Sequence, residues 1–226
     1  LYESTLNGIM GQIAEAQGIN RRGMIFKLIT ALKQICNHPY QYKKSGEMTK
    51  DISGKCDKFI SVLDGIIQNK EKSVVFTQYK EMGKILVPIV QNELSTTPLF
   101  FHGSLNTAQR EAMLKQFSED DDSKIMILSL KAGGTGLNLT NATNVIHYDL
   151  WWNPAVEEQA TDRTYRIGQK HNVLVHRLIT LGTFEEKIDE MIKKKKELVN
   201  MAVFEGEKTI TDLTDEEIYN IFTLTS

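Results

Sequence analysis

A short apolar run, IMILS at residues 125–129, leads directly into a glycine-rich segment, LKAGGTGLNL at residues 130–139. Such a run, bounded by glycine, is typical of a strand that is buried on both faces of a parallel sheet. The glycines Gly133, Gly134 and Gly136 let the backbone approach a ligand and expose amide groups to an anion. The stretch predicts a strand and an anion-binding loop, although a glycine turn without a ligand fits equally well. No Gly-Lys-Ser/Thr follows, so it is not a Walker A loop.

Further apolar runs of strand length lie on both sides of this stretch, and helical patterns separate most of them. The runs are residues 73–77, 99–102, 144–148 and 173–179, and the helical patterns are residues 57–68, 80–94, 107–117 and 154–165. Strands that alternate with amphipathic helices imply a parallel sheet with helices on both faces. We therefore expect an α/β fold with its function at the carboxyl ends of the strands, where open parallel sheets bind ligands.

These patterns divide the 226 residues into three zones. Residues 1–54 have a helical spacing of apolar residues and no convincing strand, and residues 55–182 hold the alternating pattern. Residues 183–226 begin with a helix that continues to about Val199. We expect a helical linker or protrusion, an α/β lobe, and a C-terminal helical extension, which suits a chain of this length.

The composition is that of an ordinary globular chain, with 41% hydrophobic and 25% charged residues. The formal net charge of −2 excludes a globally basic nucleic-acid binder, so any contact with nucleic acid must be confined to one face. Cys36 and Cys56 lack metal-ligand spacing, and we expect them to be reduced and structural in an intracellular protein. No signal peptide and no apolar run of about 20 residues is evident, and the missing initiator Met suggests a fragment of a longer protein.

Two of the six arginines, Arg163 and Arg166, lie within one predicted helical turn. Residues three apart project from the same helix face, where two guanidinium groups can grip phosphate oxygens bidentately and stay charged. Such a pair suits a triphosphate whose negative charge grows in the transition state. A surface helix with salt bridges to Glu157, Glu158 and Asp162 fits the spacing alone at least as well.

Two loops at predicted strand ends carry residues suited to nucleic-acid contacts. DLWWNP, residues 149–154, places both tryptophans just before a helix. Trp152 could stack on a base or touch a nucleic-acid backbone, whereas Trp151 fits the core better, and a core position for both is also open. FFHGS, residues 100–104, ends a strand with small polar residues ahead of a helix N-terminus, which suits a phosphate.

Together and in this order, these segments resemble the C-terminal half of the Swi/Snf-type DNA translocases of helicase superfamily 2. The matching segments are residues 32–39, 73–79 (motif IV), 102–104 with Arg110, 131–139 (motif V), 149–154 (the tryptophan loop) and 159–169 (motif VI). The strings GGTGLNL and DRTYRIGQ are highly specific, and their combination is more specific than either alone. The resemblance covers nearly the whole chain and implies the second of two RecA-like lobes, with helical segments at both ends.

The resemblance also implies roles for individual residues. Arg163 and Arg166 match arginine fingers that act on ATP, and Gln159 matches the glutamine of motif VI. The implied nucleotide-binding positions are Gly134, Gly136, Asn138, Arg163 and Arg166. The implied DNA-contacting positions are Thr77, Gln78, His102, Gly103, Ser129, Lys131 and Trp152.

Two departures from the family pattern bear on these expectations. Tyr165 stands where the family usually has a histidine, which we expect to have little effect. The chain contains no Walker A lysine and no Asp-Glu metal-binding motif, both of which belong to the first lobe. ATP and Mg²⁺ are therefore expected to bind mainly to that absent lobe, and this chain alone is expected to be inactive as an ATPase.

The expected partners are duplex DNA, the N-terminal RecA-like lobe of the same protein and a protein target on DNA, with no membrane. Two other functions stay open from the sequence. One is a non-catalytic module that binds nucleic acid or protein through the same loops, and the other is an RNA helicase lobe of the same superfamily. The compact form favours a bacterial cytoplasmic protein associated with the nucleoid, or a nuclear protein if the source is eukaryotic.

Overall fold

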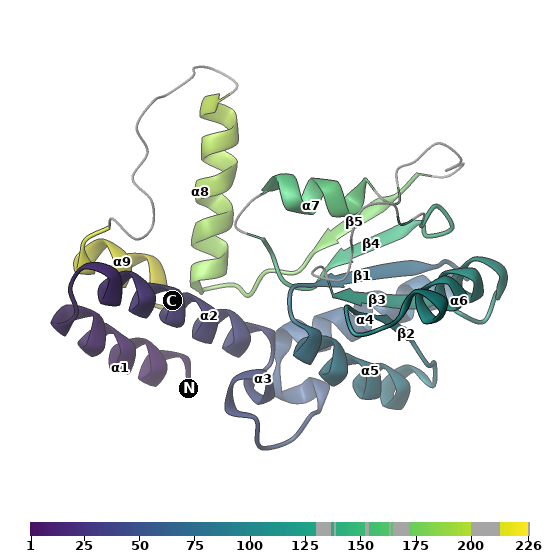
Figure 1. Cartoon of the computed structure of the whole chain (residues 1–226), viewed down its shortest axis with the longest axis horizontal. Helices are drawn as coiled ribbons and strands as arrows, with labels where there is room; N and C mark the ends of the chain where they lie inside the picture. Colours follow the sequence, from purple (N-terminus) through teal and green to yellow (C-terminus); the bar gives the residue numbers. More distant parts are fainter. Residues whose placement is uncertain are drawn as a thin grey trace. The chain divides into compact units, whose positions relative to one another are not determined.

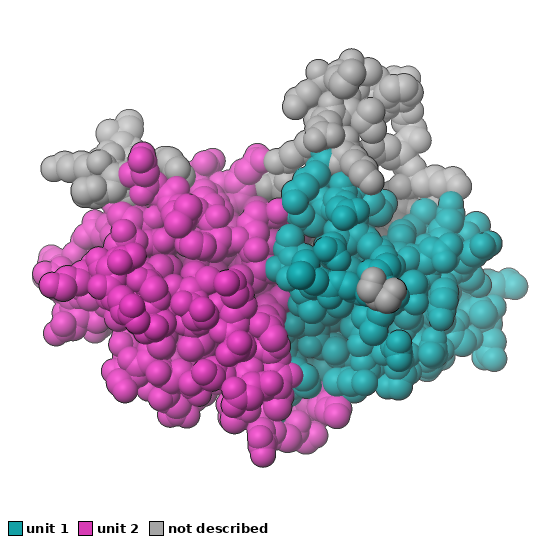
Figure 2. Space-filling view, turned by 180° about the vertical axis from the view of Figure 1, so that it is seen from behind, with its two compact units in different colours: residues 1–42, 179–226 teal, residues 43–178 magenta. Residues whose placement is uncertain are grey.

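The structure is a computed structural model of the chain, and it describes residues 1–129, 137, 139–151, 154–162, 164, 172–199 and 213–225. Contacts group the chain into two compact units, residues 1–42 with 179–226 and residues 43–178. Figure 2 colours the two units separately. The division into three zones stays a prediction, and the structure adds that helices from both ends of the chain share one unit.

Residues 43–178 fold around a five-stranded sheet whose neighbouring strands are all parallel. The strands are β1 (Ser73–Thr77), β2 (Leu99–Phe101), β3 (Ile125–Ser129), β4 (Asn144–His147) and β5 (Leu174–Arg177). Their order across the sheet is β2-β3-β1-β4-β5 (Figure 1). The predicted α/β fold with a parallel sheet is therefore confirmed. As continuous apolar runs predict, β1, β3 and β4 are buried along their whole length.

Helical elements precede β1 and lie between most of the later strands of this sheet. They are the 3₁₀ turn η1 (Lys50–Ile52) and the helices α4 (Gly54–Gln68), α5 (Lys80–Leu94), α6 (Thr107–Glu119) and α7 (Pro154–Thr161). The Ser53 hydroxyl accepts the Cys56 amide at the start of α4, and Asn106 and Gln109 form a reciprocal capping box on α6. Each cap satisfies amide groups that the first turn of a helix leaves without partners.

The core of this unit packs against the sheet. Alternate residues of a strand share a face, and one face of β1, β2, β3 and β4 joins α6 in a buried cluster. Its members include Val74, Phe76, Phe101, Phe117, Met126, Leu128 and Val145. On α4, Phe59 meets Tyr148 edge-on with ring centroids 5.2 Å apart. Full burial of such side chains stabilises the fold by about 1.5–3 kcal/mol each, and it holds the strand ends in place.

The helix α5 lies close to the edge strand β2 because Gly83 has no side chain. A Cβ atom at Gly83 would overlap the Phe100 ring, whose Cδ2 atom would lie 3.1 Å away with two other ring atoms closer still. The same Phe100 ring is tilted against the His102 ring at a centroid distance of 4.8 Å. The packing at Gly83 therefore helps to position the first residue of the loop after β2.

The other unit is helical and joins the two ends of the chain. It contains α1 (Tyr2–Glu15), α2 (Gly18–Asn37), α3 (Pro39–Lys43, which ends at the unit boundary), α8 (Phe184–Val199) and α9 (Asp215–Phe222). The Tyr2 hydroxyl donates to the Phe222 carbonyl at 2.8 Å, and the Phe184 and Phe222 rings lie 5.2 Å apart. Arg21 pairs with Asp215 at 2.8 Å. Within the described residues, no helix combines the length and apolar character that crossing a membrane would require.

Candidate functional site

The carboxyl ends of β1, β2 and β3 meet at one edge of the sheet. β1 and β3 run in register up to the pair Thr77 and Ser129, and β2 ends beside β3 at Phe101. Ligands of open parallel sheets bind at this edge. The structure brings five of the predicted DNA-contacting positions to it, namely Thr77, Gln78, His102, Gly103 and Ser129.

A buried carboxylate, Asp149, organises the end of β1. Asp149 has no exposed surface, and it accepts the Thr77 hydroxyl at 2.5 Å and the Gln78 amide at 2.8 Å. The Gln78 side chain donates to the Leu150 carbonyl at 2.7 Å. Thr77 is fully buried and Ser129 is 3% exposed, so neither hydroxyl lies on the surface. These contacts tie the end of β1 to the segment that follows β4.

Basic side chains surround the loops that follow β1 and β2. Lys80 Nζ donates to Ser104 Oγ at 2.6 Å, and Arg110 Nη2 donates to the Gly103 carbonyl at 3.0 Å. The Ser104 amide donates to His102 Nδ1 at 3.3 Å. Partial burial lowers the pKa of His102, and the nearby charges of Lys80, Lys84 and Arg110 lower it further. A local positive field is thus present in a chain whose net charge is −2.

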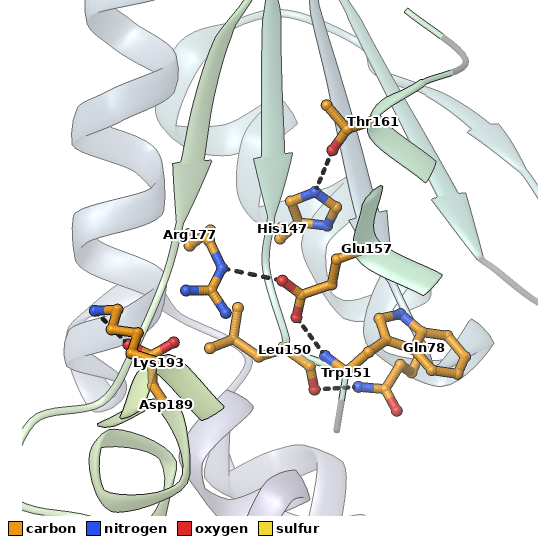
Figure 3. A network of polar contacts seen from close by, with 9 residues as sticks. All are labelled: Gln78, His147, Leu150, Trp151, Glu157, Thr161, Arg177, Asp189 and Lys193. Carbon is orange, nitrogen blue, oxygen red and sulfur yellow. Dashed lines mark hydrogen bonds and ion pairs between the residues drawn. The ribbon is translucent and has the colours of Figure 1, made fainter. Parts of the chain in front are cut away.

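The carboxylate of Glu157, on the first turn of α7, makes two bonds. One oxygen accepts the Trp151 backbone amide at 2.7 Å and the other accepts Arg177 Nε at 3.0 Å (Figure 3). Glu157 is only 7% exposed. This carboxylate therefore pairs with Trp151 and Arg177, whereas the sequence left it open as a surface partner of the arginine pair. Gln159, two residues further on, is exposed.

The last turn of α7 is held by His147 at the end of β4. His147 Nε2 and the Thr161 hydroxyl lie 3.0 Å apart, and the ring stacks on Phe76 at 5.6 Å. Burial, with a smaller effect of the nearby Arg177 charge, lowers the pKa of His147 to about 4. The imidazole is therefore neutral near pH 7, and α7 is tied to the sheet at both ends.

Several predicted site residues lie outside the described residues. They are Lys131, Gly134, Gly136, Asn138, Trp152, Arg163 and Arg166. Trp151, which the sequence assigned to the core, is half-buried. Within the part of the chain that the structure describes, no three His, Cys, Asp or Glu side chains are grouped so that they could hold a metal ion.

Sequence reasoning did not single out three residues that organise this edge, Lys80, Asp149 and Arg177, and it considered Glu157 only as a surface partner of the arginine pair. Asp149 could have been found, because it is a polar residue one position beyond the end of an apolar run, where a parallel strand delivers its functional groups. Lys80 carries a weaker signal at the start of the helix that follows such a strand. The pairing of Glu157 with Arg177 has no sequence signal, because it joins residues 20 positions apart on different elements.

Comparisons with known proteins agree with this geometry. The model of the helicase conserved C-terminal domain matches residues 54–168. Bacillus subtilis YwqA, named for an ATP-dependent helicase/translocase, is 42% identical over all of this chain and 24% of its own length. Human DNA excision repair protein ERCC-6 is 32% identical over 92% of this chain and 15% of its own length. The chain thus spans about a quarter or less of these curated relatives.

Two solved structures from Sulfolobus solfataricus are similar over the whole chain. A SWI2/SNF2 ATPase core in complex with dsDNA has a TM-score of 0.86 and 38% identity, with 47% of that chain covered. A SWI2/SNF2 ATPase C-terminal domain has a TM-score of 0.82 and 36% identity, with 92% of that chain covered. The family match over half of the sequence and this nearly complete coverage of a solved domain show that the chain belongs to the helicase conserved C-terminal domain family, among its SWI2/SNF2 members.

Proposed function

We propose that this chain is the second motor lobe of an ATP-dependent DNA translocase that holds duplex DNA by its backbone and completes an ATP site formed mainly by a first lobe. The observation that carries the proposal is the loop cluster after β1 and β2, where basic side chains surround small polar groups. Support for duplex DNA comes from the similar Sulfolobus solfataricus core, which was solved with dsDNA.

Phosphate is the group that this cluster suits. Lys80 and Arg110 supply charge, and the loop of His102, Gly103 and Ser104 supplies small polar groups beside them. Contacts to phosphates position a protein on DNA without reading its sequence, as a translocase requires. Local positive charge is sufficient for this, because the electrostatic attraction acts over about 8–10 Å at physiological salt.

The buried side chains at this edge are proposed to support the loops that contact DNA. The Thr77 and Ser129 side chains are buried, so we assign them to shaping the loops rather than to touching phosphate. Gln78, which is half-buried, supports the tryptophan loop through the Leu150 carbonyl. Lys131 and Trp152 are proposed as further DNA contacts from the adjacent loops.

On the nucleotide side, we propose that Arg163 and Arg166 act as arginine fingers on the γ-phosphate of ATP. Gln159 is exposed, precedes Arg163 by four positions in the sequence, and is proposed to face the same nucleotide. The remaining proposed nucleotide contacts are Gly134, Gly136 and Asn138. The first lobe would mainly hold Mg²⁺, which would supply positive charge to offset the charge that develops on the phosphates. Repeated closure of the two lobes would then move this lobe along the duplex.

The proposal is tested in the complete protein that carries this chain. Arg163→Ala and Arg166→Ala are expected to lower DNA-stimulated ATP hydrolysis by roughly 10³-fold or more, because fingers of this kind supply 10³–10⁵ in rate. Equilibrium binding of a nucleotide analogue should change little. Lys115→Gln, on the exposed face of α6, is a control that should keep full turnover.

Three outcomes would contradict the proposal. Normal turnover in both arginine variants would reject the finger assignment. Stimulation by RNA but not by duplex DNA would favour an RNA helicase lobe. Absence of any nucleotide hydrolysis by the complete protein would favour a non-catalytic binding module. The 226-residue chain alone is expected to hydrolyse no appreciable ATP.

A further inference from the structure

Glu157 joins α7, on the proposed nucleotide side, to the segment of Leu150 and Trp151 on the proposed DNA side. Its carboxylate is buried on the first turn of α7, and each oxygen has its own partner, the Trp151 amide at 2.7 Å and Arg177 Nε at 3.0 Å. Figure 3 shows the carboxylate between the segment that contains Leu150 and Trp151 and the edge strand β5. A charged group that is 7% exposed is retained in a fold only when such bonds compensate for its lost hydration.

The Trp151 amide connects Glu157 to the proposed DNA side. Residues 149–151 are held from the end of β1 by three contacts: the Thr77 hydroxyl and the Gln78 amide donate to Asp149, and the Gln78 side chain donates to the Leu150 carbonyl. The next bond along this segment runs from the Trp151 amide to Glu157. A continuous series of hydrogen bonds through the backbone of residues 149–151 therefore links the end of β1 to α7.

On the nucleotide side, α7 needs these attachments to keep its orientation. A helix of eight residues is marginal by itself, because short helices gain too few backbone bonds to offset nucleation. Glu157 holds its first turn, and the contact between His147 and Thr161 holds its last turn. Gln159 lies between these two attachments, and Arg163 is two positions beyond Thr161 in the sequence, where the helix ends.

We propose that Glu157 is a positioning residue that couples the tryptophan loop to the orientation of α7, so that DNA engaged at the loop aligns the arginine pair for ATP hydrolysis. This inference rests on the proposed function of the lobe. Arg177 takes part in the same positioning role. Its ion pair with Glu157 fixes the carboxylate from β5 and so defines the direction in which the carboxylate faces Trp151. Neither residue is proposed to touch DNA or nucleotide.

Two substitutions separate the two bonds of the carboxylate. Glu157→Gln keeps an oxygen that can accept the Trp151 amide but turns an amide group, itself a donor, toward Arg177. Arg177→Lys keeps the positive charge but loses the planar fork that fixes the geometry. Asp215→Asn is a matched control, because Asp215 is also a first-turn carboxylate that pairs with an arginine, Arg21, in the other unit.

The experiment measures steady-state ATP hydrolysis by the complete protein as a function of duplex DNA concentration. For Glu157→Gln we expect kcat at saturating DNA to fall about tenfold or more, because small misplacements of catalytic groups cost up to about 10²-fold. The concentration of DNA at half-maximal stimulation and the affinity for an ATP analogue should stay within about twofold. Arg177→Lys should act in the same direction, the double variant should lose no more than Glu157→Gln alone, and Asp215→Asn should match the wild type.

The outcomes are distinguishable from failure of the proposed function. If Arg163→Ala and Arg166→Ala keep full turnover, the function of the lobe is wrong, whatever Glu157 does. If those variants are inactive but Glu157→Gln and Arg177→Lys both keep DNA-stimulated kcat within twofold of wild type, the positioning role is overturned. If Glu157→Gln loses affinity for DNA and ATP together with kcat, and its melting temperature falls, Glu157 is a structural tie only. Should Glu157→Gln fail to fold, the same criteria apply to Arg177→Lys.

Discussion

The close approach of α5 to β2 allows a sharp test of the packing that positions the His102 loop. Gly83→Ala places a methyl group against the Phe100 ring, whereas Gly65→Ala, on the exposed side of α4, meets nothing within 4 Å. Both glycines lie inside helices and neither has a positive φ. The two substitutions therefore share the same change in helix propensity and differ in steric cost.

The magnitudes follow from these two terms. Alanine is more favourable than glycine in a helix by about 0.5–1 kcal/mol, so Gly65→Ala should raise the free energy of unfolding by that amount. Extra volume in a packed site costs about 1–3 kcal/mol, so Gly83→Ala should leave the free energy of unfolding unchanged or lower it by up to roughly 2 kcal/mol. The difference between the two variants is the steric cost itself. It should largely disappear when Phe100→Leu removes the opposing ring.

Native-state hydrogen exchange at the amides of β1 and β3 is the appropriate assay, because it reports the opening of the unit of residues 43–178 by itself. A global unfolding curve of a two-unit chain need not be two-state. Equal stabilisation by Gly83→Ala and Gly65→Ala would refute the reasoning. A deficit at Gly83 that persists in the Phe100→Leu background would show that the Phe100 ring is not the obstacle.

Two further predictions concern charge. In the complete protein, Lys80→Gln should reduce the slope of log affinity for duplex DNA against log salt by about 1, because one phosphate contact is lost. Lys115→Gln, on the exposed face of α6, should leave this slope unchanged. Equal effects of the two substitutions would show that Lys80 does not contact DNA. His147 has a pKa of about 4 in the fold against 6.5 in an unfolded chain, so the unfolded chain binds the proton first as the pH falls. The contribution of His147 to the free energy of unfolding should therefore be fully present above pH 6.5 and decline by roughly 3 kcal/mol toward pH 4. Denaturant titrations of His147→Gln should lack this decline. If the free energy of unfolding of His147→Gln depends on pH as that of the wild type does, this assignment to His147 is rejected.

Apolar patterning predicted most of the sheet. The runs at 73–77 and 125–129 coincide with β1 and β3, since a strand covered on both faces needs an uninterrupted apolar run. The run at 173–179 predicted a longer strand than β5, which spans only Leu174–Arg177 and is mostly exposed. An edge strand pairs on one side and is covered incompletely, and the local sequence does not show which strand will be at the edge. The pairing of Tyr2 with Phe222 was equally out of reach, because it joins residues 220 positions apart.

The candidate site, like the fold, was predicted from the sequence only in part. The loops after β1 and β2 were found because strand ends and glycine-containing turns have local signals, and the edge of the sheet brings them together. The buried states of Thr77 and Ser129 were not predicted, because a hydroxyl at a strand end is equally suited to a ligand and to an internal acceptor such as Asp149. The sequence left Glu157 open as a surface partner of the arginine pair, since only the position of Arg177 on β5 makes its burial favourable.

The contact between Tyr2 and Phe222 has a consequence for synthesis of the chain on the ribosome. The helices α1 and α2 leave the ribosome about 180 residues before their partner α9, a delay on the order of 10–40 s at usual elongation rates. The unit of residues 43–178 is continuous in sequence and can fold during that interval. The helices α1 and α2 must meanwhile keep an apolar face uncovered, which makes them a point of engagement for chaperones until α9 has been synthesised.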